Sequence, residues 1–384
     1  MLIFTPLICL LNIVVDPYLL FGRPRTAEFN ARKPAIAEQE HLIKAYDVLR
    51  FEPETLLLGS SSIAMGLDAR SSAWPLSARP VYNLGLPGEG VFAVRRYLQH
   101  VEARERLHTV ILGLNFRDFL QLRGQHELLF ESRLAVTRSG SPNPDASRQR
   151  LYDIAYASLS LDAILESINT LRGNISSDSP DTVSGNVEPY WHRTEISRGG
   201  AYQFVVLGDL YYSRIYRVSG MDAGVWDDVR QIFDLCQSRG IHLIVILEPV
   251  LVDELEVADI AGRWSAVEDW KRELTRMAFA YGNPPTSSHV ELWDFLGYDS
   301  YSTESVPYSK SAMRWFLTPS HYTRALGDLM VKRITGSGDD SFGARLTPEN
   351  IESHLSEVRQ ERDLYRVRQQ SDAARVRRLY AAMN

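Results

Sequence analysis

Short apolar runs that alternate with longer amphipathic stretches predict an α/β fold for this chain. Each run is four to seven residues long and is followed by a segment whose apolar residues recur at helical spacing. Strand–loop–helix units that repeat in this way favour three layers, with a parallel sheet between two layers of helices. The predicted strands are Thr55–Leu58, Val81–Leu84, Thr109–Leu112, Ile241–Leu247 and Val290–Phe295.

Amphipathic segments between and after these runs predict the helices. Gly240 stands where a helix C-terminus commonly has glycine, so it closes the helix before the fourth strand. Residues from about 121 to 200 are rich in loop-forming residues around one helical stretch, and we interpret them as an insertion. The predicted helices are Ala35–Arg50, Val91–Val101, Leu151–Leu171, Gly224–Arg239, about 261–281, Arg324–Ile334 and a highly charged C-terminal helix from Pro348 toward Tyr380.

The N-terminal segment Met1–Val15 is almost entirely apolar, and the Asp16-Pro17 pair should end its helix. Fifteen residues make about 22 Å of helix, less than the bilayer's hydrocarbon thickness of about 30 Å. The segment is therefore a short membrane anchor or a buried N-terminal helix, and we favour the anchor. The expected organisation is a membrane anchor over 1–22, an α/β domain over 23–335 and a charged helical tail over 336–384.

Composition excludes several classes of function. The chain is 45% hydrophobic and 23% charged, with a net charge of −6, which is typical of a globular protein and argues against a nucleic-acid-binding surface. Its two cysteines, Cys9 and Cys236, predict neither a disulfide nor a zinc site. The sequence contains no HExxH, GxxxxGK[ST] or CxxC motif, so we expect no metal and no organic cofactor.

Specific polar groups follow three of the predicted strands. Ser61, Gly88 and Asn115 lie 27 residues apart, about one strand–helix unit per step, and His321 comes late in the chain on a loop before the last helix of the domain. Parallel strands end at the same edge of a sheet, where ligands bind. Acyl transfer through serine needs these parts: a nucleophile, a base and donors for an oxyanion. The simpler alternative is a serine helix cap, a turn glycine, a strand-ending asparagine and a packed histidine.

The segments around these residues resemble the SGNH (GDSL-like) hydrolase superfamily, whose fold is a flavodoxin-like three-layer sandwich. Gly59-Ser60-Ser61 is similar to its nucleophile turn, although Ser60 replaces an aspartate. The resemblance implies that Ser61 is the nucleophile and that His321 is the general base. The segments that carry it are Gly59–Ser61, Asn83–Gly88, Gly113–Phe116 and Thr318–His321, and they imply an oxyanion hole from Gly88, Asn115 and the Ser61 amide.

More narrowly, residues from about 10 to 335 resemble membrane-anchored bacterial SGNH-like proteins related to polysaccharide O-acetylation. The features that carry this likeness are VVDPY after the apolar leader, the GSS turn, YNLGLPG, the Trp270-Lys271 pair, LWDF and SHYTRALGD. It implies a single-pass protein of the bacterial inner membrane with its domain in the periplasm. The expected partners are an exported polysaccharide, an acyl donor and the membrane, with no nucleic acid.

The late motif departs from the superfamily where a triad has its acid, because Thr318 stands there. A threonine supplies no negative charge to orient the histidine. Three alternatives are open: a carboxylate from elsewhere takes this role, with Asp294 and Asp328 as candidates, a backbone carbonyl takes it, or catalysis has been lost. Glu248, before Pro249 at a strand end, either faces the cleft or caps a neighbouring helix.

Two functions remain open from the sequence. The first is a serine acyl esterase or O-acyltransferase that acts on an exported polysaccharide. The second is a catalytically inactive SGNH-like scaffold or glycan-binding protein, which the departures at Ser60, Phe116 and Thr318 favour. A phosphoester-handling protein is a weaker alternative, because no lysine or metal-ligand cluster accompanies the serine turn and the glycine loop.

Overall fold

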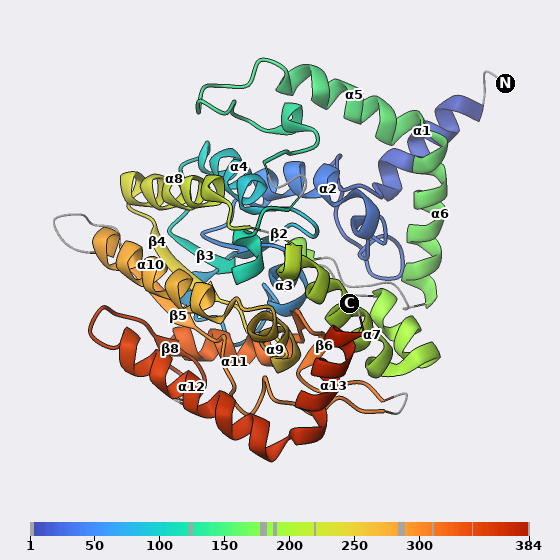
Figure 1. Cartoon of the computed structure of the whole chain (residues 1–384). Helices are drawn as coiled ribbons and strands as arrows, with labels where there is room; N and C mark the ends of the chain where they lie inside the picture. Colours follow the sequence, from blue (N-terminus) through green and yellow to red (C-terminus); the bar gives the residue numbers. More distant parts are fainter. Residues whose placement is uncertain are drawn as a thin grey trace.

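Five short parallel strands form the centre of the sheet in the computed structural model of the chain (Figure 1). The structure describes residues 4–122, 126–176, 183–186, 190–218, 220–282, 289–308, 311–339 and 341–382. The strands are β1 (Thr55–Gly59), β2 (Val81–Gly85), β3 (Thr109–Leu114), β4 (His242–Leu247), β5 (Val290–Asp294), β6 (Phe316–Thr318), β7 (His321–Tyr322) and β8 (Ala344–Arg345). The main sheet has the order β2-β1-β3-β4-β5-β8, with β8 antiparallel to β5, and β6 and β7 form a separate antiparallel pair.

The predicted α/β fold with a mostly parallel sheet is confirmed, and the five predicted strands coincide with β1 to β5 to within two residues at either end. Their register explains how the site is assembled. Thr55 at the start of β1 pairs with Val81 on one side and with Thr109 on the other. The three strands therefore begin at one level, and their carboxyl ends meet at one edge of the sheet.

Helices cover both faces of the sheet, and most coincide with the predicted amphipathic segments. The sequence did not predict the helices Tyr190–Val218 and Val252–Ile260. It predicted single helices over Leu151–Leu171 and from Pro348 toward Tyr380, and the structure divides each of these into two. The helices are α1 (Phe4–Val15), α2 (Ile36–Phe51), α3 (Ser61–Gly66), α4 (Val91–Glu102), α5 (Ala146–Leu159), α6 (Leu161–Ser176), α7 (Tyr190–Val218), α8 (Ala223–Arg239), α9 (Val252–Ile260), α10 (Trp264–Gly282), α11 (Arg324–Ile334), α12 (Ile351–Arg368) and α13 (Gln370–Ala381). Short 3₁₀ helices are η1 (Leu76–Ala78), η2 (Phe116–Phe119), η3 (Glu131–Arg133) and η4 (Val183–Gly185).

Each face of the sheet has its own hydrophobic core, because successive strand side chains point to opposite sides. Leu56 and Leu58 of β1 pack in one cluster with residues of α4, α8 and α10. Leu57 between them packs in a second cluster with Ile63 of α3 and Leu326 of α11. The arrangement is therefore helix, sheet, helix, as the alternation of strands and helices predicted.

The N-terminal helix α1 spans 12 residues and ends at Val15, where the Asp16-Pro17 pair predicted an end. Within the described ranges, no helix combines the length and the apolar character needed to cross a bilayer. A spanning anchor over residues 1–22 is therefore not supported, and residues 1–3 lie outside the described part. The structure instead packs α1 against α5 and α6, which belong to the region predicted as an insertion (Figure 1).

The charged C-terminal region is packed onto the α/β core. Strand β8 adds to the sheet beside β5, and Leu355 of α12 is buried in the same cluster as α10. Arg375 of α13 is only 3% exposed. Its Nη1 donates to Asp209 Oδ2 of α7 at 3.0 Å, and its Nη2 donates to the Asp253 carboxylate of α9. Helix α13 thus links α7 and α9 through one buried arginine.

Candidate active site

Ser61 begins α3 directly after β1, in a turn that requires glycine. Gly59 has a φ of +153°, and a Cβ atom on it would lie 2.5 Å from Cγ1 of Ile63 and 3.2 Å from the carbonyl oxygen of Gly113. Because any larger residue would collide there, the chain can turn sharply only with glycine at this position. The turn presents Ser61 at the carboxyl edge of the sheet.

His321 lies on β7, next to Thr318, its pairing partner on β6. Its Nε2 atom is 2.7 Å from Ser61 Oγ, although the two residues are 260 positions apart in sequence. Its Nδ1 atom is 2.6 Å from Thr318 Oγ1 and 3.3 Å from Ser320 Oγ. Ser320 Oγ accepts a hydrogen bond from the hydroxyl of Tyr212. The structure thus brings the predicted nucleophile and base together, with hydroxyl groups where a triad has its carboxylate.

A cavity of about 480 Å³ opens beside this pair. Its volume lies in the range of small-molecule sites in proteins. Gly88 is on its wall with a φ of +80° and open space around the position of a Cβ atom. The lining residues are Ser60, Ser61, Gly88, Glu89, Gly90, Arg117, Asp118, Leu122, Tyr211, Tyr212, Ile215, Ser320 and His321. Of the predicted site residues, Ser61, Gly88 and His321 therefore share one cavity.

Asn115 lies outside that lining, although it follows β3 at the predicted edge. Its side chain is 2% exposed, and its Nδ2 donates to Glu248 Oε2 at 2.6 Å. The hydroxyl of Tyr322 donates to the other carboxyl oxygen of Glu248 at 3.1 Å. The amide group of Asn115 is therefore engaged in a buried network with Glu248, and Asn115 does not share the cavity lining with Ser61 and Gly88.

Glu248 supports Asn115 from the end of β4. Burial, together with the nearby Asp118 carboxylate, raises the pKa of Glu248 to about 8. A neutral carboxyl group at pH 7 can share hydrogen bonds with an amide and a phenol without an unpaired buried charge. Glu248 does not line the cavity, and the described partners of its carboxyl group are side chains, so it neither faces the cleft nor caps a helix.

Asp294, the predicted candidate for the acid, is part of a different cluster. Its Oδ2 atom accepts from Lys271 Nζ at 2.6 Å and lies 2.8 Å from Nε2 of His354. Although burial opposes ionisation, Lys271 and His354 hold the pKa of this carboxyl below its usual value. Its charge is thus compensated away from His321, whose Nδ1 is instead beside Thr318. The assignment of Asp294 as the acid is not supported by this geometry, and Asp328, the other candidate, lies on α11.

Arg117 is a site residue that the sequence did not single out. Its Nη1 donates to both carboxylate oxygens of Glu254 on α9, at 3.0 and 3.1 Å. Its Nη2 donates to Ser62 Oγ at 3.3 Å, and its guanidinium carbon is 5.6 Å from the ring centre of Tyr212. A fixed cation thus lies on the cavity wall, bonded to Ser62, the residue that follows the predicted nucleophile. Its partners are far apart in the chain, and its only sequence signal is its position two residues after Asn115.

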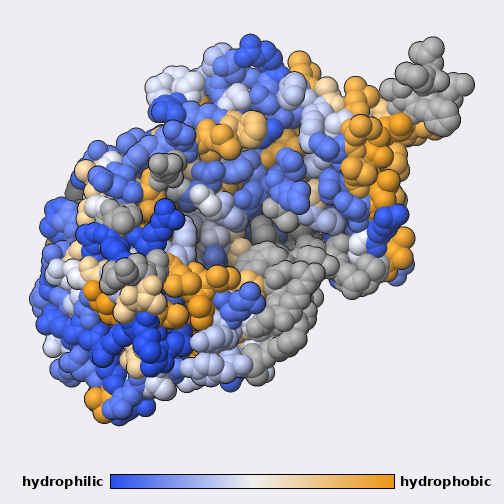
Figure 2. All heavy atoms as spheres, turned by 45° about the vertical axis from the view of Figure 1, so that its right-hand side comes forward, coloured by the Kyte–Doolittle hydropathy of each residue, from blue (hydrophilic) through white to orange (hydrophobic). Residues whose placement is uncertain are grey.

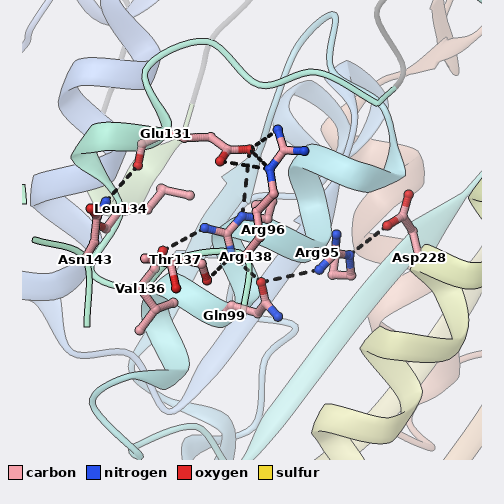
Figure 3. Close-up of polar contacts among 10 residues, drawn as sticks. All are labelled: Arg95, Arg96, Gln99, Glu131, Leu134, Val136, Thr137, Arg138, Asn143 and Asp228. Carbon is pink, nitrogen blue, oxygen red and sulfur yellow. Dashed lines mark hydrogen bonds and ion pairs between the residues drawn. The ribbon is translucent and has the colours of Figure 1, made fainter. Parts of the chain in front are cut away.

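The helix α4, which begins after the cavity-lining glycines, is fixed by a polar network with α8 and with the segment after η3 (Figure 3). Arg95 Nε donates to Asp228 Oδ1 of α8 at 2.7 Å. Arg96 donates to the carbonyl oxygens of Val136 at 2.7 Å and of Thr137 at 3.0 Å. These bonds hold the segment after η3 against α4, so the wall that carries Gly88 is supported from behind.

Among the residues that the structure describes, no group of three His, Cys, Asp or Glu side chains is arranged to hold a metal ion. Comparison with known proteins gives no match, whether with family models, curated proteins or solved structures. The functional argument therefore depends on the geometry of the cavity and its side chains.

Proposed function

We propose that this chain is an SGNH-like serine acyl esterase or O-acyltransferase. The observation that carries the proposal is the 2.7 Å contact between Ser61 Oγ and His321 Nε2 on the wall of a cavity. A serine hydroxyl within hydrogen-bond distance of an imidazole nitrogen is the arrangement by which serine is activated as a nucleophile.

In the proposed reaction, Ser61 Oγ attacks the carbonyl carbon of an ester and gives its proton to His321 Nε2. The tetrahedral intermediate then expels the alcohol, which takes the proton from His321 and leaves an acyl group on Ser61. Water in hydrolysis, or a sugar hydroxyl in transfer, attacks this acyl-serine while His321 accepts the attacking group's proton. The second tetrahedral intermediate then expels Ser61 Oγ, which takes the proton back from His321 as the acid or the new ester is released.

The developing oxyanion needs donors on the cavity wall. The backbone amide of Gly88, together with that of Ser61, suits this task in the proposal, since both residues line the cavity. Arg117 adds a positive charge on the same wall. Its ion pair with Glu254 holds the guanidinium group in place, so the field it creates is preorganised.

The proposed substrate is an O-acyl ester, most simply O-acetyl, on an exported bacterial polysaccharide, and the proposed location is the periplasmic side of the inner membrane. The sequence resemblance supports both. The cavity offers hydroxyl groups and the ring of Tyr211 at its wall, and sugars bind to such surfaces through hydrogen bonds and ring packing.

A catalytically inactive scaffold or glycan-binding protein is the second candidate. Two observations favour it: a hydroxyl group stands in place of the acid beside His321, and the side chain of Asn115 is engaged with Glu248. A hydroxyl group beside Nδ1 stabilises the imidazolium that forms less than a carboxylate does, so it supports a weaker general base.

Labelling of the full chain with a fluorophosphonate probe distinguishes the two candidates. We expect the wild-type chain to be labelled, Ser61→Ala to abolish labelling, and His321→Ala to slow it by at least about 100-fold. Ser139→Ala, which removes an exposed hydroxyl elsewhere, is the matched control and should label like the wild type. An unlabelled but folded wild-type chain, beside a reactive serine esterase in the same extract, would favour the scaffold.

A further inference from the structure

Three neighbouring helices, α1, α5 and α6, expose large apolar side chains on one side of the molecule. Figure 2 shows hydrophobic residues gathered there, on the side where Figure 1 places α1 and α6. We call this surface the lateral apolar face. Its residues are 36% to 77% exposed: Leu7, Leu10, Leu11 and Val14 of α1, Leu151, Tyr152 and Leu159 of α5, and Leu161, Leu165 and Ile175 of α6.

The three helices are joined by specific contacts. Asn12 of α1 is completely buried, and its Nδ2 donates to the carbonyl oxygen of Ser158 at 3.0 Å. Its Oδ1 accepts from Ser167 Oγ of α6 at 2.9 Å. Just beyond α1, the ring of Tyr18 stacks on that of Tyr156 with centres 5.8 Å apart. The polar side of α1 is thereby docked onto α5 and α6, and its apolar stripe faces outward.

The spacing of the exposed residues makes the face continuous. On α1 they recur at intervals of three and four residues, which is one side of a helix. Leu161 and Leu165 of α6 are four residues apart, and Leu151 and Leu159 of α5 are eight residues apart, which is about two turns. Isolated exposed leucines are common on protein surfaces, but a contiguous patch of this size marks an interaction site.

Exposed arginines at the margins indicate what this surface binds. Arg148 lies one turn before Leu151 on the apolar stripe of α5, where Asp145 is its ion-pair partner. Arg172 lies seven residues after Leu165 on the stripe of α6 and is exposed. Arg23 Nε donates to the carbonyl oxygen of Ile13 near the end of α1. Apolar side chains bordered by cations are typical of helices that lie in the interface of a membrane with anionic lipids.

The composition of α1 also suits insertion into one surface of a bilayer. Helices that lie in the interface bury their apolar side about 5–10 Å deep. None of the residues of α1, Phe4–Val15, is ionisable except Cys9, so nothing charged would enter the hydrocarbon with it.

We propose that the lateral apolar face is a membrane-binding surface that lies in the interface of a bilayer containing anionic lipids. α1 then binds together with the α5–α6 hairpin as a preformed three-helix surface. This inference gives a structural basis to the membrane location proposed above. It does not depend on the chemistry at Ser61, so vesicle binding and probe labelling can fail separately.

Co-sedimentation of the full chain with lipid vesicles tests the proposal. We expect the chain to bind vesicles of phosphatidylcholine with phosphatidylglycerol more tightly than vesicles of phosphatidylcholine alone. A triple variant with Leu10→Gln, Leu161→Gln and Leu165→Gln should need a roughly tenfold higher lipid concentration for half-maximal binding. The matched control, Leu76→Gln with Leu364→Gln, changes exposed leucines outside the face and should bind like the wild type.

The charged margin is tested separately. Arg148→Gln with Arg172→Gln should remove most of the preference for anionic vesicles and retain binding through the apolar residues. The proposal is overturned if the folded wild-type chain stays in the supernatant with both kinds of vesicle. It is equally overturned if sedimentation velocity shows a dimer that the triple variant dissociates while vesicle binding is unchanged, since the face is then an interface between copies of the chain.

Discussion

Thr318→Asp should make the candidate nucleophile more reactive. Thr318 Oγ1 is 2.6 Å from His321 Nδ1, the position from which a carboxylate acts in a serine triad. An aspartate there would hold the Nδ1 proton and stabilise the imidazolium that forms when His321 takes the proton of Ser61. Thr318 is only half-buried at the end of β6, so the longer side chain has room to turn.

The size of the gain follows from Coulomb's law. A carboxylate about 4 Å from the imidazolium, at an effective dielectric constant of about 20, attracts it by about 4 kcal/mol. Partial desolvation of the new carboxylate at this half-buried position offsets about half of that attraction. A net stabilisation of about 2 kcal/mol corresponds to a roughly 30-fold faster reaction of Ser61.

The rate of fluorophosphonate labelling at pH 7 measures this effect. Thr318→Asn has nearly the same shape as Thr318→Asp without its charge, and it should label no faster than the wild type. Ser61→Ala in the Thr318→Asp background should abolish labelling. If Thr318→Asp and Thr318→Asn label at the same rate, the charge at this position does not reach the imidazole, and the proposed role of His321 as the base is wrong.

Two further predictions concern stability. Burial and Asp118 raise the pKa of Glu248 from 4.5 to about 8, so the folded chain keeps a proton that the unfolded chain releases. The free energy of unfolding should therefore fall as the pH rises from about 4.5 to about 8. In urea unfolding, Glu248→Gln should remove up to about 5 kcal/mol of this fall. If the variant has the same pH dependence as the wild type, Glu248 is ionised in the folded chain. Arg375→Met should lower the free energy of unfolding by about 3 to 5 kcal/mol, because it leaves two buried carboxylates without their cation. The exposed control Arg377→Met should change it by less than about 0.5 kcal/mol. Burial raises the pKa values of Asp209 and Asp253, so protonation should make the loss smaller at pH 5 than at pH 8, and equal losses would contradict this.

The strands could be predicted because each leaves a local pattern in the sequence. A strand buried on both faces needs an unbroken apolar run, and Ile241–Leu247 matches β4 to within one residue. Gly59 marked the turn before Ser61 for a similarly local reason, the lack of space for a Cβ atom. Because parallel strands end at one edge, the neighbourhood of Ser61 and Gly88 followed from the order of the strands.

Side-chain directions in the site could not be predicted, because they depend on partners distant in sequence. Asn115 is at the predicted edge, but Glu248, 133 residues later, fixes where its amide group points. Arg117 faces the cavity because of Glu254, 137 residues away. The sequence leaves Asp294 available as an acid, because its contacts with Lys271 and His354 leave no pattern of their own in the sequence.

The position of Arg375 in the fold has a consequence for the biosynthesis of the protein. Arg375 is translated after both of its carboxylate partners. It follows Asp209 by 166 residues and Asp253 by 122 residues. Until α13 emerges and docks, α7 and α9 hold buried carboxylates without a cation, and their packing is incomplete. These helices carry Tyr212, which donates to Ser320 Oγ beside His321, and Glu254, which accepts from Arg117. The candidate site is therefore completed only when α13 docks, and a truncation before α13 should disturb a cavity whose lining residues all precede it.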